Sequence, residues 1–511
     1  MFNRTFSAGL HGINGFLVQV EADVSNGLPE FSMVGFLGSE VKEAKERVRI
    51  SLKNSGFKLP AKRITINLSP ADLRKEGTAF DLPIAVAILA TLGFIPEESI
   101  KDTLIIGELS LNGQVNKVNG VLPIVKMAQD YGFTRCILPM ENGKEGAVIS
   151  GIDVIGVKSL EQVVDYLNNP IMIEPEYVNV EEMFCHQEKE WDIDFEDING
   201  QVAAKRAVEI AVCGMHNILL MGTPGAGKTM LAKRIPTIMP DLTLEESLEI
   251  SKVYSVFGLL SNEQSLILKR PFRSPHHTIT ISALTGGGRN AKPGEISLAS
   301  GGVLFLDELP EFNKNTIEIL RQPLEDKYVT ITRLNGSFRY PTNFMLVAAM
   351  NPCNCGYYPD RNRCNCSVNQ VQRYLGKVSQ PLLDRIDICV ETLQINYKEL
   401  EQKSKGETSE DIRKRVMKVR KIQEERYRKE EIHFNSELTP KMIRKYCKLG
   451  DKEKELIENA FVNLNLTARA YHRILKVART IADLEGDGDI NTYHLSEAIC
   501  YRSMDKKFWN I

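Results

Sequence analysis

The chain has 511 residues, of which 43% are hydrophobic and 25% are charged, an ordinary composition for a globular protein. It is too long for one hydrophobic core, so we expect roughly two to four domains. The 64 lysines and arginines nearly balance the 66 acidic residues, so net charge alone does not indicate a nucleic-acid partner. The N-terminus lacks a signal-peptide pattern and no apolar run is long enough to span a membrane, which predicts a cytoplasmic protein.

Residues 1–170 alternate short apolar runs with turns and helical patterns, which predicts an α/β or α+β domain. Residues 171–196 predict an acidic linker. Between Glu174 and Asp197 there are ten acidic residues and one basic residue, Lys189. We interpret this segment as a solvated tether. The alternative is a charged strap that competes with a polyanion for a basic surface.

Residues 222–229 carry the most informative motif of the chain, because they fit G-x-x-x-x-G-K-[ST] without a mismatch. Residues 218–221 precede it as a predicted strand and residues 230–235 open a predicted helix, which is the context of a phosphate loop. Lys228 is expected to reach the β- and γ-phosphates and Thr229 to ligate Mg²⁺, so ATP and Mg²⁺ are the expected cofactors. The expected nucleotide ligands are Gly222, Thr223, Pro224, Gly225, Ala226, Gly227, Lys228 and Thr229.

Two later apolar runs end in polar residues suited to ATP hydrolysis. Residues 303–306 end in Asp307 and Glu308. A buried strand there would deliver Asp307 to the Mg²⁺ ion and place Glu308 to polarise the attacking water. Residues 344–350 end at Asn351, and a polar residue at the tip of a central strand can sense the γ-phosphate.

A β-hairpin is predicted just before the run that ends at Asn351. Residues 329–332 alternate, Asn335-Gly336 is a type I′ turn signal, and the chain returns through residues 338–340. Arg333 and Arg339 are expected to flank the tip of this hairpin.

Four cysteines follow Asn351 as two C-x-C pairs separated by eight residues, and they match a tetrahedral Zn²⁺ site. The alternative is a set of free cysteines in a loop. The loop between the pairs is basic and aromatic and offers a possible contact for nucleic acid. The expected zinc ligands are Cys353, Cys355, Cys364 and Cys366. His276 and His277 are interpreted as structural residues or as loop residues near a pore or the nucleotide.

The C-terminal third is predicted to be helical. Arg385 follows a short helix and is expected to be exposed, residues 396–435 predict a long basic connecting helix, and residues 436–511 predict an all-α lid in which Arg469 begins a helix. The basic helix is interpreted either as a stripe that tracks DNA phosphates or as a solvated face with internal ion pairs. Its cations are Arg413, Lys414, Arg415, Lys418, Arg420, Lys421, Arg426, Arg428 and Lys429.

Taken in order, these motifs resemble an AAA+ ATPase core at residues 197–395 followed by a helical lid. The phrases RPFRSPHH (270–277), KPGEISLASGGVLFLDELPEF (292–312) and QPLLDRID (380–387) are similar to the magnesium-chelatase-like subfamily, and within it to the bacterial ComM/YifB family. The resemblance implies that Asn351 is sensor 1, that Arg385 is an arginine finger acting on a neighbouring subunit, and that Arg469 is sensor 2. It also implies a homo-oligomeric ring, commonly a hexamer.

The N-terminal domain resembles the protease domain of Lon, an α+β fold of the S5 type. Ala79 stands where the resemblance places the nucleophilic serine and Leu122 stands where it places the lysine, while Thr78 and Lys126 are out of position. We therefore expect an inactive domain that serves ring formation or substrate docking.

The family resemblance implies a DNA helicase with branch-migration activity, used when incoming DNA is integrated during natural transformation. Its expected partner is single-stranded or branched DNA, contacted by a hairpin that in related helicases points into the ring pore. The alternative is a chelatase-like motor that remodels a protein partner without DNA.

Overall fold

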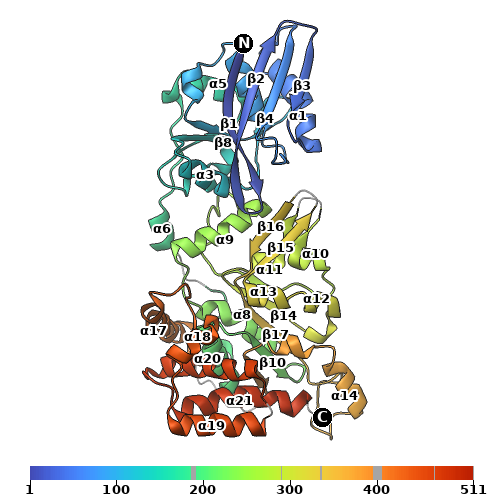
Figure 1. The fold of residues 1–511 in the computed structure, drawn as a ribbon, viewed down its shortest axis with the longest axis vertical. Helices are drawn as coiled ribbons and strands as arrows, with labels where there is room; N and C mark the ends of the chain where they lie inside the picture. Colours follow the sequence, from blue (N-terminus) through green and yellow to red (C-terminus); the bar gives the residue numbers. More distant parts are fainter. Residues whose placement is uncertain (186–190, 289–290, 334–335, 395–405, 465, 510–511) are drawn as a thin grey trace.

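The computed structural model describes residues 1–185, 191–288, 291–333, 336–394, 406–464 and 466–509. Figure 1 shows an N-terminal domain at one end of the long axis, a central domain in the middle and a helical domain at the other end. The predicted α/β class with a helical C-terminal part is therefore confirmed. No helix among the described residues is long and apolar enough to cross a membrane.

The N-terminal domain is built on a seven-stranded mixed sheet. Its strands in spatial order are β3 (Glu30–Val34), β4 (Arg63–Ser69), β2 (Asn14–Ser25), β1 (Phe2–His11), β5 (Thr103–Ile105), β8 (Arg135–Pro139) and β9 (Asp153–Val157). A two-stranded sheet, β6 (Glu108–Leu109) and β7 (Val115–Asn116), lies beside it. The helices are α1 (Ser39–Asn54), α2 (Asp81–Thr91), α3 (Val121–Asp130), α4 (Gly143–Ala147), α5 (Leu160–Asn168) and α6 (Val180–Cys185).

Both faces of this sheet are covered, because alternate residues of a strand point to opposite sides. Ile105, Ile137 and Ile155 join the core packed under α1, α2 and α5. Leu104 and Leu138 join a second core with α3. Helix α2 is buried along its whole length, which explains its uninterrupted apolar sequence.

The central domain contains a five-stranded, fully parallel sheet. Its strands in spatial order are β11 (Phe272–Arg273), β14 (Val303–Leu306), β17 (Met345–Met350), β10 (Ile218–Gly222) and β18 (Ile388–Thr392). Alternate residues of β10, β14 and β17 fall into two separate cores on the two faces. Strands buried on both faces require continuous apolar runs, so the three runs in the sequence predicted these strands correctly.

Helices and short strands surround this sheet. They are α7 (Val202–Gly214), α8 (Lys228–Ile238), α9 (Leu244–Phe257), α10 (Ile281–Thr285), α11 (Glu295–Leu298), α12 (Lys314–Glu318), α13 (Arg321–Asp326), α14 (Val368–Leu375), α15 (Gln380–Leu383), β12 (Gly286–Gly287) and β13 (Lys292–Pro293). The predicted hairpin is formed by β15 (Tyr328–Arg333) and β16 (Gly336–Pro341), paired in antiparallel register. Asn335, half of the predicted turn, lies outside the described residues.

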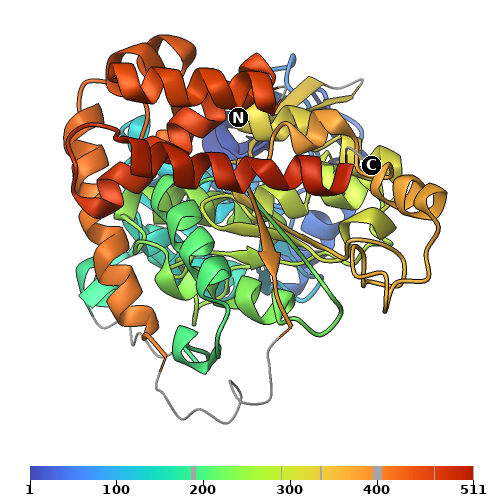
Figure 2. The same cartoon turned by 90° about the horizontal axis from the view of Figure 1, so that it is seen from below.

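The helical domain consists of α17 (Ser409–Tyr427), α18 (Pro440–Tyr446), α19 (Asp451–Asn463), α20 (Ala468–Glu485) and α21 (Thr492–Trp509). Figure 2 shows α21 running across the lower end of the molecule toward α14. There the indole of Trp509 donates a hydrogen bond to the carbonyl of Leu375 at 3.3 Å. Helix α17 buries Ile412, Val416 and Val419, so one face of this basic helix is packed into the core.

The described part of the acidic linker packs in places against both neighbouring domains, whereas Glu174, Glu181, Glu182 and Asp192 are exposed. Met183 and Phe184 pack against the core under α3. The carboxylate of Asp197 pairs with Arg234 at 2.7 Å, and that of Asp194 accepts a hydrogen bond from the backbone amide of Ser409. Part of the linker is therefore anchored to the protein, whereas its exposed acidic residues fit the predicted solvated segment. Lys189 lies outside the described residues.

The N-terminal domain contacts the hairpin directly. Figure 1 shows the β1–β2 end reaching down to β16. The rings of His11 and Phe338 lie 4.6 Å apart, and Ile13 packs with Ile331 and Tyr340. On the other side, Ser255 of α9 donates a hydrogen bond to Glu145 of α4. The position of the hairpin therefore depends on two domains.

Candidate nucleotide-binding site

The phosphate loop lies between β10 and α8, as the sequence predicts. Gly225 and Gly227 have φ values of +75° and +79°, a region that side chains disfavour, so glycine is required at both positions. A Cβ at Gly222 would overlap Thr392 of the neighbouring strand β18. The loop thus leads into the N-terminus of α8, where backbone amides and the helix dipole favour a phosphate.

Four of the predicted site residues, Lys228, Thr229, Asp307 and Asn351, converge at this loop. The Lys228 ammonium donates to the carbonyls of Gly222 and Thr223 at 2.8 and 3.0 Å and to Asn351 Oδ1 at 3.0 Å. Burial lowers the pKa of Lys228, and the nearby acidic residues oppose this shift. Thr229 donates to Asp307 Oδ2 at 2.7 Å. The hydroxyl and carboxylate needed for Mg²⁺ are thus adjacent, and their oxygen donors suit that ion.

Glu308 follows β14 with a φ of +52°, which is unusual for a residue with a side chain. Its carboxylate is 61% exposed and lies 4.0 Å from His277 Nδ1. His277 in turn lies against His276, with ring centroids 4.0 Å apart. Of the interpretations open for this histidine pair, a position near the nucleotide site is the one that the geometry favours for His277.

A cavity of about 110 Å³ adjoins the loop. Ile198, Met230 and Leu231 supply apolar walls, and Gln201 donates to the carbonyl of Ala226 at 3.1 Å. An apolar pocket beside a phosphate loop is suited to an adenine base. These residues form no motif, so the sequence did not predict their place in the site. The one signal in the sequence is that Ile198 and Gln201 lie near the start of the predicted ATPase core at residue 197.

Arg385 is buried, so the expectation of an exposed arginine is wrong. Its guanidinium donates to the carbonyls of Arg321 and Pro381 at 2.9 and 2.6 Å and pairs with Glu325 at 2.7 Å. Its side chain is 8% exposed. Helix α15 ends at Leu383, two residues before Arg385, whose side chain contacts α13 through Arg321 and Glu325.

Arg385 also lies at the opposite end of the parallel strands from the phosphate loop, because it precedes β18 whereas the loop follows the neighbouring strand β10. Strands β10 and β18 are parallel, with Ile218 beside Ile388 and Gly222 beside Thr392. Arg385 precedes β18, and its carbonyl accepts a hydrogen bond from Asn217, which precedes β10. A strand rises about 3.3 Å per residue, so the two ends of β10 are roughly 15 Å apart. The arginine is therefore remote from the phosphate loop of its own chain.

Arg469 shares a cavity of about 340 Å³ with Arg385. It is exposed at the start of α20, and the cavity also receives Lys327, Arg473 and Lys476. Asp387 lines the same cavity, and despite its burial Arg473 and His216 hold the pKa of that carboxyl well below its usual range. The cavity is thus rich in cations, and the structure brings the two predicted arginines together away from the phosphate loop.

The four cysteines form one cluster, with every pair of sulfur atoms within 4.8 Å. The Sγ atoms of Cys353 and Cys364 lie 3.8 Å apart. Zn–S bonds of about 2.3 Å in a tetrahedron place sulfurs roughly 3.8 Å apart, so this donor set fits Zn²⁺. The cluster touches the phosphate loop, because a Cβ at Gly356 would overlap the ring of Pro224.

The hairpin carries the two predicted arginines, but only one lies near the tip. Arg333 is exposed, pairs in register with Gly336 and donates to the carbonyl of Gly288 at 3.2 Å. Arg339 folds back over the ring of Tyr328 at 3.4 Å, at the base of the hairpin, so its expected place beside the tip is wrong. A groove of about 1070 Å³ separates the hairpin from α10 and α12, and Arg333 and His277 both line it.

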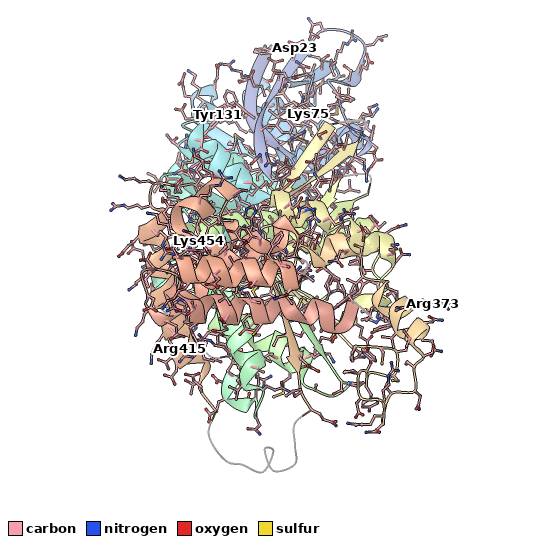
Figure 3. The ribbon with its side chains drawn as sticks, turned by 60° about the horizontal axis from the view of Figure 1, so that its bottom comes forward. Asp23, Lys75, Tyr131, Arg373, Arg415 and Lys454 are labelled. Atoms are coloured by element: carbon pink, nitrogen blue, oxygen red, sulfur yellow. The ribbon has the colours of Figure 1, made fainter. Side chains whose placement is uncertain are left out.

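Five of the nine cations of the predicted basic helix form ion pairs within the protein, whereas Lys418, Lys421, Arg428 and Lys429 are exposed. Arg415, labelled in Figure 3, contacts Glu209 at 2.6 Å, and Arg426 pairs with Asp483 at 2.5 Å. Arg420 pairs with Glu424 at 2.7 Å. Of the two interpretations of this helix, the one with internal ion pairs is therefore favoured over a stripe for DNA.

The predicted loss of the protease site fits the geometry. The hydroxyl of Thr78 donates to the carboxylate of Glu108, whereas Lys126 pairs with Asp130 at 2.8 Å. The two nearest substitutes for a serine and a lysine are thus engaged with other residues. The Lon-like fold of this domain stays a prediction.

Comparison with known proteins assigns all three parts to one family. The model for "Magnesium chelatase, subunit ChlI" matches residues 194–400, that for "Subunit ChlI of Mg-chelatase" matches residues 20–142, and that for "Magnesium chelatase, subunit ChlI C-terminal" matches residues 406–502.

Curated relatives match over nearly the whole length. Competence protein ComM of Haemophilus influenzae is 44% identical, covering 98% of this chain and 97% of the relative. YifB of Salmonella typhimurium is 40% identical over 97% and 96% of the two chains, and the protein Rv2897c of Mycobacterium tuberculosis is 37% identical over 98% of each. With the phosphate loop, Asp307, Glu308 and Asn351 assembled in one site, the chain belongs to the magnesium-chelatase-like AAA+ ATPases of the ComM/YifB type.

Proposed function

We propose that this chain forms a cytoplasmic ring, commonly hexameric, in which ATP hydrolysis drives DNA unwinding or branch migration. The process served is the integration of incoming DNA during natural transformation, or recombination. The observation that carries the proposal is the separation of the predicted catalytic residues between the two ends of the parallel strands of one sheet. In the proposed ring, the Arg385 end of one subunit would face the phosphate loop of the next.

The position of the two arginines supports the proposed ring. Lys228, Asp307, Glu308 and Asn351 gather at the carboxyl ends of the strands, where ligands bind in open parallel sheets. Arg385 lies at the opposite, amino ends of the strands, and it shares a cationic cavity with Arg469. As finger and sensor 2, they would stabilise the transition-state charge on the nucleotide of a neighbouring subunit. An arginine supplied in trans is worth about 10³–10⁵ in rate.

DNA is the proposed partner because of the hairpin and the family. Arg333 is exposed near the hairpin tip and lines the large groove beside it. In a ring, one such arginine per subunit becomes a circle of positive charge around a pore, which suits a phosphate backbone. The name of the 44% identical relative connects that protein with competence, and competence is the uptake of DNA.

The test is ATP turnover measured with no DNA and with linear, forked and four-way DNA. We expect stimulation by DNA, strongest on a branched substrate. The second candidate, a chelatase-like motor acting on a protein, is favoured by the family match to chelatase subunits. Equal turnover with and without every DNA would contradict the proposal and favour that candidate.

Replacing Arg333 by alanine should weaken DNA-stimulated turnover more than basal turnover. Each phosphate contact contributes about 0.7–0.9 to the logarithmic salt slope, so the slope of stimulation against salt should become shallower. Arg339→Ala should have the smaller effect, since Arg339 is stacked on Tyr328. Arg49→Ala, on an exposed helix of the N-terminal domain, is the matched control. Identical salt slopes for Arg333→Ala and wild type would place the DNA path elsewhere.

We also propose that the cysteine cluster holds one Zn²⁺. Cys353, Cys355, Cys364 and Cys366 would be its four ligands, and the ion would cross-link the two ends of the loop. The Cys353 end lies two residues after Asn351, and the loop touches Pro224. The module would therefore stiffen both sensor 1 and the phosphate loop.

Protein purified without added metal should contain close to one zinc per chain by elemental analysis. A Cys355→Ser/Cys364→Ser variant should lose it, because two of the four thiolate ligands are gone. Cys500→Ser, which changes an exposed cysteine outside the cluster, is the control. Full zinc content in the double variant would rule out this cluster as the site.

A further inference from the structure

Two of the three contacts described for the buried guanidinium of Arg385 come from one helix. Helix α13 supplies the carbonyl of Arg321 at its first residue and the carboxylate of Glu325 near its end. The ion pair with Glu325 measures 2.7 Å, and a third contact, to the carbonyl of Pro381 at 2.6 Å, comes from the finger's own segment. In this conformation, the donors of the proposed finger are occupied within its own subunit.

The same helix leads directly into the hairpin. Lys327 follows α13 with a φ of +60°, and Tyr328 begins β15. The far end of the hairpin returns to this junction, because the amide of Thr342 donates to the carbonyl of Lys327 at 2.9 Å and its hydroxyl donates to the carbonyl of Pro323 at 3.3 Å. A displacement of α13 therefore has to move both strands of the hairpin.

The cavity around Glu325 is suited to a competing anion. Arg469, Lys327 and Lys476 line it together with Arg385. The side chain of Glu325 is 49% exposed, whereas that of Arg385 is 8% exposed. Glu325 therefore lies between the buried guanidinium and the solvent. A phosphate group that approaches from a neighbouring subunit would meet this carboxylate and repel it, while it attracts the surrounding cations.

We propose that Glu325 is a positioning residue that holds Arg385 away from the neighbouring nucleotide until that nucleotide, or DNA on the hairpin, displaces α13. This inference rests on the proposed function, in which Arg385 acts in trans. Release of the ion pair frees the guanidinium for the γ-phosphate, and the accompanying shift of α13 passes through Lys327 to the hairpin. Hydrolysis and DNA contact are thereby linked through one helix.

The test compares full-length wild type with Glu325→Gln in basal and DNA-stimulated turnover. Without the charge that restrains Arg385, basal kcat should rise about fivefold, KM for ATP should stay within about twofold, and the stimulation factor should fall by a similar fivefold. Asp326→Asn removes the adjacent exposed carboxylate and is the matched control, expected to behave as wild type. In Glu325→Gln/Arg385→Ala, turnover should equal that of Arg385→Ala, because the effect of Glu325 acts through Arg385.

The inference would be overturned if basal kcat in Glu325→Gln were unchanged or lower while Arg385→Ala was strongly impaired. The proposed role of Arg385 as an arginine finger would then still stand. Full turnover in assembled rings of Arg385→Ala would instead contradict the proposed function. Thermal unfolding and ring assembly are measured for each variant. If Glu325→Gln fails to fold, Glu325→Ala and Glu325→Asp replace it, and wild-type basal turnover in a folded Glu325→Ala overturns the inference equally.

Discussion

Replacing Glu308 by glutamine should leave ATP binding intact and lower hydrolysis by about 10²–10⁴, the usual contribution of a general base. The amide keeps the size of the side chain but cannot accept the proton of the attacking water. Glu308 is 61% exposed, and Lys228 donates its hydrogen bonds to Gly222, Thr223 and Asn351, so the substitution leaves these bonds of the phosphate loop in place. Binding is measured by equilibrium titration with ATP and hydrolysis by steady-state phosphate release.

Lys228→Ala is the contrasting variant, because it should lose ATP binding itself. A hydrogen bond to a charged group contributes about 1.5–3 kcal/mol, which corresponds to roughly tenfold to hundredfold in affinity. Its loss also removes the contact to Asn351. Wild-type turnover in Glu308→Gln would remove this residue from the catalytic role, even if Lys228→Ala behaved as expected.

Arg385→Ala should reduce hydrolysis by about 10³ or more while ATP binding and the fold of the protomer persist. Binding persists because Arg385 lies at the opposite end of the parallel strands from its own phosphate loop. The fold persists because the carboxylate left behind, Glu325, is 49% exposed and can be solvated. ATP affinity, thermal unfolding and phosphate release are measured on the same preparation.

Mixing Arg385→Ala with Glu308→Gln should restore part of the activity. At mixed interfaces, the Arg385→Ala subunit supplies an intact Glu308 and its neighbour supplies an intact Arg385. The control is each variant mixed with itself, and subunit exchange is verified with labelled protein. Rings that exchange subunits but recover no turnover would argue against an arginine acting in trans.

The nucleotide site could be predicted from the sequence because its chemistry lies in contiguous motifs. The phosphate loop needs glycines with positive φ at fixed spacing, and Gly225 and Gly227 have them. Asp307 and Asn351 follow strands that are buried on both faces, and such strands require apolar runs that are visible in the sequence. The four cysteines were likewise marked by their spacing.

The surroundings of Arg385 could not be predicted, because its partners are distant in sequence. Glu325 precedes it by sixty residues, and nothing in either segment marks the pair. The cations of α17 show the same limit, since Arg415 and Arg426 are paired with Glu209 and Asp483 from other helices. A charge pattern shows which residues are charged, whereas tertiary packing decides which of them remain available to a ligand.

The contact between the N-terminal domain and the hairpin could also not be predicted from the sequence. His11 and Phe338 are more than three hundred residues apart, and their stacking joins two domains. The sequence had suggested only a docking or ring-forming platform for residues 1–170. The structure adds that this platform rests on the hairpin that we propose as the DNA contact.

The most direct test of the account is strand separation of a labelled four-way DNA junction by assembled rings with ATP and Mg²⁺. We predict that wild type separates the junction into its products, that Glu308→Gln binds the junction without separating it, and that omission of Mg²⁺ stops the reaction. Wild-type rings that hydrolyse ATP at the same rate with and without the junction, and leave it intact, would contradict a DNA motor.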